Sequence, residues 1–205
     1  MAQIDSPRLH RFLAMFLEDI DLNTPELNQF ISHTPTFCAY DEVHLWFADD
    51  EAQFLLRQSH PGRSGHGMVA IDILSQPDQL LSNLTQICTL SLHHLLTMEN
   101  LYIGGHLDSP LKENDIKITK WLDLLLPFMA VKNLYLYMLY SPCITLTQHE
   151  LTRGRTTEVL PVLENVLLED FQPSEPVEEG LAQFISARQL ANHPVAVSAW
   201  DRDFK

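Results

Sequence analysis

Histidines and carboxylates gather in one stretch of the sequence that could carry metal or acid–base chemistry. His60, His66 and Asp72 fall within it, and His93 and His94 follow further along. A zinc hydrolase places two histidines four residues apart on a helix together with a glutamate, and this spacing does not occur in the sequence. Adjacent histidines also point in different directions on a helix or strand. We therefore expect no metal and no cofactor, and keep an intracellular α/β enzyme with a site near the His60–Asp72 loop as an alternative.

The same stretch contains glycines that could cradle a phosphate group. Three glycines within residues 62–67 surround Arg63, but they lead into a strand pattern at Val69. A phosphate-binding loop of the usual kind needs Gly-Lys-Ser/Thr at the start of a helix. Ser64 also lacks the Gly-x-Ser-x-Gly turn that exposes a hydrolase nucleophile. The sequence therefore predicts no catalytic residues in this loop.

Aromatic residues form the remaining candidate set, and they indicate binding rather than catalysis. Tyr102 lies between Leu101 and Ile103, and Tyr135 is flanked by leucines in the same way. Because successive side chains of a strand point to opposite faces, aliphatic residues in a core leave the aromatic ones on the other face. Tyrosine and tryptophan dominate binding hot spots, although such rings can also be ordinary core. The candidate protein-binding residues are Trp46, Tyr102, Tyr135, Tyr137 and Trp200.

The elements that would position these residues are short strands recurring about every 30 residues. Each predicted strand has two apolar positions separated by one residue, as expected for a strand with one buried face. The pairs are Leu13/Met15, Val43/Leu45, Val69/Ile71, Leu101/Ile103, Leu134/Leu136, Val166/Leu168 and Val195/Val197. Regular repetition of this length is typical of a solenoid.

Helical patterns separate the predicted strands. The clearest lies between Ser174, a candidate cap, and Asn192, where the helix should stop. A shorter helix is expected to begin at Asp49 or Asp50 and to carry Phe54 and Leu55. Further helices are expected over 24–35, 80–88 and 118–127, and an interrupted one over 147–163.

Long helical connections imply parallel strands, because a tight hairpin cannot return the chain to a parallel neighbour. A doubly wound sheet needs strands that are apolar on both faces, whereas the residues between the apolar pairs here are mixed. We therefore predict one α/β domain spanning residues 1–205, a leucine-rich-repeat-like solenoid. Its roughly seven parallel strands would stand in sequential order, with helices on the convex side.

Composition narrows the classes of partner. The chain has 205 residues, 45% of them hydrophobic, and 13 Lys and Arg residues against 27 Asp and Glu residues give a formal net charge of −14. Such a surface repels phosphates, so we expect neither nucleic acid nor a membrane as partner. No long apolar span or signal-peptide pattern is seen, which predicts a cytoplasmic or nuclear protein. Cys38, Cys88 and Cys143 lie far apart and are expected to be free thiols.

Several stretches resemble the C-terminal repeat region of fungal F-box-like, leucine-rich-repeat-type proteins. The strands beginning Asn100-Leu-Tyr-Ile and Asn133-Leu-Tyr-Leu have the form of such repeats. The similar stretches are DLNTPELNQFISHTP (21–35), WLDLLLPFMAVKNLYL (121–136), GRTTEVLPVLENVLLEDFQPSEPVEEGLAQFISARQL (154–190) and HPVAVSAW (193–200). Together they cover nearly the whole chain.

The resemblance implies a substrate receptor of cullin-RING ubiquitin ligases, in which an F-box docks the ligase adaptor and the repeats present a target. A strand pattern already at residues 9–17 leaves no room for an F-box, so we expect the repeat part without it. The leading hypothesis is a non-enzymatic protein-interaction module whose partner is a protein target. A truncated repeat fragment without independent function is the other alternative. We also expect the edge at Leu13–Leu17 to be uncapped and to promote self-association.

Overall fold

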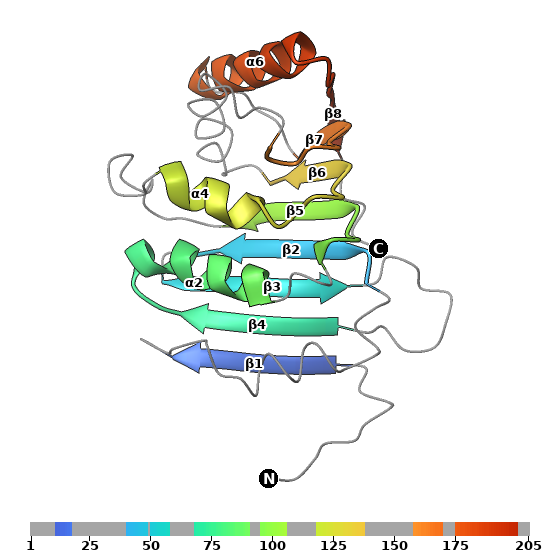
Figure 1. Cartoon of the computed structure of the whole chain (residues 1–205). Helices are drawn as coiled ribbons and strands as arrows, with labels where there is room; N and C mark the ends of the chain where they lie inside the picture. The colour runs from blue at the N-terminus through green and yellow to red at the C-terminus, as the bar shows by residue number, and fades with distance from the viewer. Residues whose placement is uncertain are drawn as a thin grey trace.

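The computed structural model describes residues 11–17, 40–48, 50–57, 68–90, 95–105, 118–137, 158–169 and 175–200. These residues form an α/β fold, in which an open β-sheet carries the described helices on one side (Figure 1). The strands are β1 (Arg11–Leu17), β2 (Glu42–Phe47), β3 (Glu51–Arg57), β4 (Met68–Leu74), β5 (Asn100–Gly105), β6 (Asn133–Leu136), β7 (Asn165–Glu169) and β8 (Ala196–Trp200). The described helices are α2 (Pro77–Leu90), α4 (Ile118–Leu125) and α6 (Glu175–Leu190).

The strand order is β1-β4-β3-β2-β5-β6-β7-β8. From β2 onward, the strands β5, β6, β7 and β8 are parallel and follow chain order, as the sequence predicted. Aliphatic residues stand in register across these strands, so that Val43 pairs with Leu101, Leu101 with Leu134 and Leu134 with Val166. This register builds one continuous apolar face.

The N-terminal half departs from the prediction of seven parallel strands in sequential order, which is wrong there. An additional strand, β3, is antiparallel to both β2 and β4, and β1 pairs with β4 rather than with β2. The β2–β3 connection is tight, since the backbone N–H of Ala48 donates to the carbonyl of Glu51 at 2.7 Å. A connection this short allows only an antiparallel neighbour.

The short helix expected from Asp49 or Asp50 is therefore a strand. Within β3, Phe54 is fully buried while Leu55 faces the opposite side of the sheet and is partly exposed. Buried residues alternate along the whole strand, which is the period of a strand with one core face. Acidic residues before an apolar run suggested a helix start, but pairing on both sides of β3 decides its conformation.

The helices pack against the apolar face of the sheet. The core combines aliphatic strand residues with one stripe from each described helix, including Leu84 and Ile87 of α2, Trp121 of α4 and Phe184 of α6. The Trp121 ring lies 5.3 Å from the ring of Phe47 on β2. α2 and α4 therefore lie on the same side of the sheet, as Figure 1 shows.

The helix ends follow the sequence signals where they are described. α2 and α4 cover most of the stretches expected over 80–88 and 118–127, while the helix expected over 24–35 lies outside the described residues. After α6, Asn192 adopts a left-handed conformation (φ 66°), and the N–H of His193 donates to the carbonyl of Arg188 at 2.9 Å. Asparagine tolerates this conformation, so the helix stops where predicted.

Two further observations concern the described helices and cysteine. None of these helices has the length and apolar character required to cross a membrane. Cys88 on α2 is a buried free thiol, as expected, and burial raises its pKa because the thiolate would lose its hydration. Cys38 and Cys143 lie outside the described residues.

Candidate binding face

The sheet face opposite the core carries the candidate aromatic residues. Strand pairing places His44 of β2 beside Tyr102 of β5, and Tyr102 beside Tyr135 of β6. Trp46 stands one step further along, beside Gly104. Because these positions alternate with core residues, they share the second face of the sheet. We call this surface the strand face.

Three rings on the strand face stack on one another. The ring centroids of His44 and Tyr102 are 4.2 Å apart with planes 3° from parallel, and those of Tyr102 and Tyr135 are 4.1 Å apart at 10°. The spacing between paired strands, about 4.8 Å, brings neighbouring rings to this separation. The stack therefore follows directly from the parallel register, and it fixes the orientation of each ring.

A second set of rings packs across the first. Trp200, at the end of β8, reaches over β7 to lie 4.9 Å from Tyr135, 5.5 Å from Tyr137 and 5.8 Å from Tyr102. Trp46 meets Tyr137 edge to face at 5.6 Å. All five predicted binding residues are therefore brought into one contiguous aromatic cluster.

The close approach of Trp46 and Tyr137 depends on a glycine between them. A Cβ atom at Gly104 would lie 2.6 Å from Cδ2 of Tyr137 and 2.9 Å from Cζ3 of Trp46. Both distances are shorter than side-chain carbons tolerate. The absence of a side chain at this position lets the two rings close over the β5 backbone.

The cluster is less exposed than the sequence suggested. Tyr102 and Tyr137 are each only 9% exposed, whereas Trp46 is 41% exposed. Tyr102 and Tyr137, which the sequence assigned to the binding face, are therefore buried on that face rather than exposed. Tyr102 is buried because His44 and Tyr135 cover its two sides and Trp200 packs on it from the far edge of the sheet.

The Glu42 carboxylate contacts two residues of the stack. The Tyr102 hydroxyl donates to Oε1 of Glu42 at 3.4 Å, and Nε2 of His44 lies 3.2 Å from Oε2 of the same residue. Since an ionised carboxylate only accepts hydrogen bonds, Nε2 is the donor in this contact. Burial raises the pKa of Tyr102, and the Glu42 carboxylate and the neighbouring Tyr135 raise it further. The Tyr102 hydroxyl thus remains a donor at neutral pH.

Asp72 is the one described residue of the alternative enzyme site. It is 8% exposed and lies on β4, where Nε2 of Gln53 donates to its Oδ1 at 2.6 Å. His60 and His66 lie outside the described residues. In the part of the chain that the structure describes, no group of three His, Cys, Asp or Glu residues is arranged to hold a metal ion.

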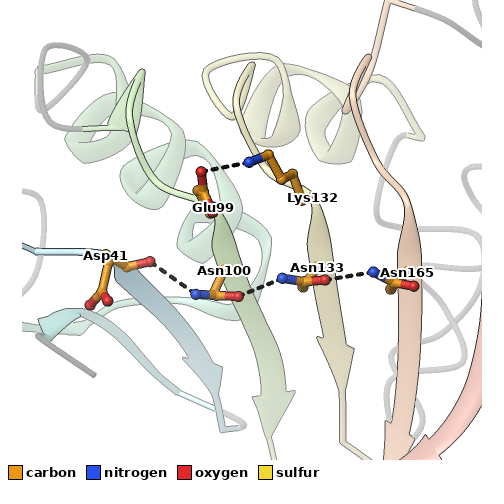
Figure 2. Close-up of polar contacts among 6 residues, drawn as sticks. All are labelled: Asp41, Glu99, Asn100, Lys132, Asn133 and Asn165. Atoms are coloured by element: carbon orange, nitrogen blue, oxygen red, sulfur yellow. Dashed lines mark hydrogen bonds and ion pairs between the residues drawn. The ribbon is translucent and has the colours of Figure 1, made fainter. Parts of the chain in front are cut away.

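An asparagine ladder holds the amino ends of three parallel strands (Figure 2). The side-chain amide of Asn165 donates to Oδ1 of Asn133 at 2.8 Å, and that of Asn133 donates to Oδ1 of Asn100 at the same distance. Asn100 continues the ladder to the backbone carbonyl of Asp41 at 3.4 Å. Because each amide supplies both a donor and an acceptor, the ladder fixes the register of β5, β6 and β7.

Sequence reasoning did not identify several of these polar residues. The asparagines were visible at the first position of repeating strands, and their common spacing was the available signal. Glu42, His44 and Gln53 gave no such signal, because their roles depend on neighbours from other strands.

Searches of protein-family models, curated proteins and solved structures find no match to this chain.

Proposed function

We propose that this chain is a non-enzymatic protein-interaction module that binds a protein partner on the strand face around Trp46. The observation that carries the proposal is the 41% exposure of Trp46 on a cluster whose other rings are packed in fixed orientations. A partner that covers a preorganised ring removes apolar area from water at little cost in conformational entropy. Rings of this kind are typical hot spots.

A leucine-rich-repeat-like architecture for the C-terminal half forms part of the proposal. Parallel strands in chain order, helices on one side and the asparagine ladder support it. A repeat array leaves its strand face available for a partner, since the helices pack on the other face. The resemblance to F-box-like proteins extends the proposal to a ubiquitination target as the partner, and this extension rests on the resemblance alone.

The proposal is tested by photo-crosslinking with the full chain. A photoreactive phenylalanine analogue replaces Trp46 in one variant and Leu126 in another. Leu126 is the matched control because it is also 41% exposed but follows α4 on the helical side. We expect a discrete crosslinked protein in cell extract from position 46 only, competed away by excess wild-type chain and not by chain carrying Trp46→Ala.

Equal crosslinking at both positions, or undiminished competition by Trp46→Ala, would overturn the proposal. The ligase extension has a separate readout, because a repeat part without an F-box should compete with the intact receptor, so the crosslinked protein should carry fewer ubiquitin chains when this chain is overproduced. Unchanged ubiquitination would remove the extension while leaving the interaction module in place.

A further inference from the structure

The two outer strands of the described sheet run in the same direction. β5, β6, β7 and β8 are all parallel to β2. β3 is antiparallel to both β2 and β4, so β4 and its parallel neighbour β1 also run in the direction of β2. Because β1 and β8 share one direction, β1 of a second copy can lie beside β8 as a parallel strand, with the described helices of both copies on the same side of the sheet (Figure 1).

The two outer strands also share one register. When the strand pairs are followed across the sheet, Ala14 of β1 stands in the same row as Ala199 of β8, and Phe12 stands in the same row as Val197. Between these ends, both rows consist of buried core residues. A second copy placed in this register would therefore continue both core rows without a shift.

The core rows are left open at β8. Ala199 is exposed, although its pairing partner Leu168 on β7 is buried. Val197 is only partly buried, although its partner Val166 is buried. A strand added beside β8 would therefore remove apolar surface of both residues from water.

The backbone of β8 offers hydrogen bonds along the same edge. The N–H of Ala196 donates to the carbonyl of Glu164 at 2.8 Å, on the side of β7. Because successive backbone groups of a strand point to alternate sides, the N–H groups of Val197 and Ala199 point to the outer edge, where no described strand follows β8. A strand edge that presents such groups is a template for pairing with another chain.

An exposed methionine lies on the other outer strand. Met15 on β1 is 61% exposed, and it follows Ala14 just as Trp200 follows Ala199. In the shared register, Met15 of one copy and Trp200 of the next would therefore meet on the strand face, on backbones about 4.8 Å apart. A thioether packs well against an aromatic ring, and Trp200 is partly exposed. The two outer strands are thus complementary in side chains as well as in direction and register.

We propose that copies of this chain assemble head to tail, with β1 of one copy paired in parallel with β8 of the next and Ala14 opposite Ala199. Two different surfaces meet, so each added copy again presents one β1 edge and one β8 edge, and growth continues beyond two copies. Pairing of β1 with β1 would instead be antiparallel about a two-fold axis and would stop at a dimer. The inference is independent of the proposed function, because Trp46 lies on β2 in the interior of the sheet.

Blocking one edge at a time tests the inference, with sedimentation velocity of the full chain at rising concentration as the measurement. Met15→Lys places a charge on β1, and Ala199→Pro removes an outward N–H of β8 while leaving the bonds to β7 in place. Met129→Lys is the matched control, since Met129 is also exposed but lies in the turn before β6. We expect the wild type and Met129→Lys to form species larger than dimers, and each edge variant to stay monomeric. Far-UV circular dichroism confirms that each variant folds.

A mixture of the two edge variants separates head-to-tail pairing from pairing of β1 with β1. The Met15→Lys chain keeps an intact β8 edge, and the Ala199→Pro chain keeps an intact β1 edge. Together they should form a 1:1 complex that grows no further. Pairing of β1 with β1 would give no such complex and would leave Ala199→Pro able to associate by itself.

Cysteine pairs in the same mixture report the register. Ala14→Cys is added to the Ala199→Pro chain, and Ala199→Cys is added to the Met15→Lys chain. These two cysteines should form a disulfide under mild oxidation, because paired strands hold their Cα atoms about 4.8 Å apart. Ser198→Cys in place of Ala199→Cys is the control, since its side chain points to the opposite face and should crosslink far more slowly.

Four results would overturn the inference. These are a wild type that stays monomeric at the highest soluble concentration, association of Ala199→Pro equal to that of the wild type, a mixture of edge variants without a complex, and equal crosslinking from positions 198 and 199. A loss of association for Met129→Lys as large as that for Met15→Lys would also reject it, because the effect would then be general charge repulsion.

Discussion

Asn133 is hydrogen-bonded on both sides by asparagines of neighbouring strands, accepting from Asn165 and donating to Asn100, each at 2.8 Å. The three residues come from segments separated by long connections, yet they occupy the same position at the start of β5, β6 and β7. The ladder thus acts as a register device for the part of the sheet that supports the aromatic stack.

Replacing the middle asparagine tests this role. Asn133→Ala leaves a donor on Asn165 and an acceptor on Asn100 without their partner in a half-buried site, and should lower the free energy of unfolding by about 1–3 kcal/mol. Urea denaturation followed by circular dichroism measures the change. Lys132→Ala is the neighbouring control, since it removes an exposed ion pair with Glu99 and should lower the free energy of unfolding by less than Asn133→Ala does. Equal losses of unfolding free energy for the two variants would show that the ladder contributes no more to stability than the exposed ion pair does.

Gly104→Ala should disturb the contact between Trp46 and Tyr137. The added Cβ would lie within 2.9 Å of both rings, so one ring must move, and we expect a loss of about 1–3 kcal/mol in unfolding free energy. A double-mutant cycle with Trp46→Leu measures the coupling between the two positions, because the smaller side chain relieves part of the clash. Additive losses would show that the rings do not depend on the glycine.

Stability should fall at alkaline pH. Burial raises the pKa of Tyr40 from 10.0 to about 12, and burial together with Glu42 raises that of Tyr102. A raised folded-state pKa contributes stability that is complete below the unfolded value near 10 and is lost as pH rises through the folded value. Melting temperatures between pH 9 and pH 12 should therefore decline, and more gently for Tyr102→Phe. A melting temperature that stays constant over this pH range would contradict the burial of these hydroxyls.

The N-terminal edge should promote self-association. β1 is an end strand of the described sheet, and Met15 on it is 61% exposed. Unpaired strand edges recruit other strands, and a charge on the edge strand opposes this. Sedimentation at rising concentration should show association that Met15→Lys reduces. Leu190→Lys, at a position 90% exposed on α6, is the control and should not reduce it. A strictly monomeric wild type would refute the prediction.

The C-terminal half of the sheet was predictable because the sequence pattern within each strand indicates which of its faces is buried. The strands β5, β6 and β7 each carry two aliphatic core residues separated by one position, and each helix that the structure describes there has an apolar stripe. The shared face of Tyr102 and Tyr135 followed from the same alternation. Periodicity assigns faces well wherever consecutive repeats become spatial neighbours.

The N-terminal half was not predictable in the same way. Pairing of β1 with β4 joins segments with two other strands between them in the chain, and no local pattern encodes that choice. The burial of Tyr102 on β5 likewise depends on Trp200, which lies on β8, three strands away in the sheet. Both features arise from tertiary contacts, which override local propensity.

The placement of α2 couples the unfolding of the two halves of the sheet. The chain leaves β4, passes through α2 and enters β5, and these two strands are separated by β3 and β2. In a simple repeat array each unit contacts only its neighbours, so a terminal repeat can unfold while the others stay folded. Here the β4–α2–β5 connection joins the antiparallel strands β2, β3 and β4 to the parallel strands. α2 also contacts both β4 and α4. The two halves should therefore melt as a single unit, with the β7–α6–β8 end the part free to fray.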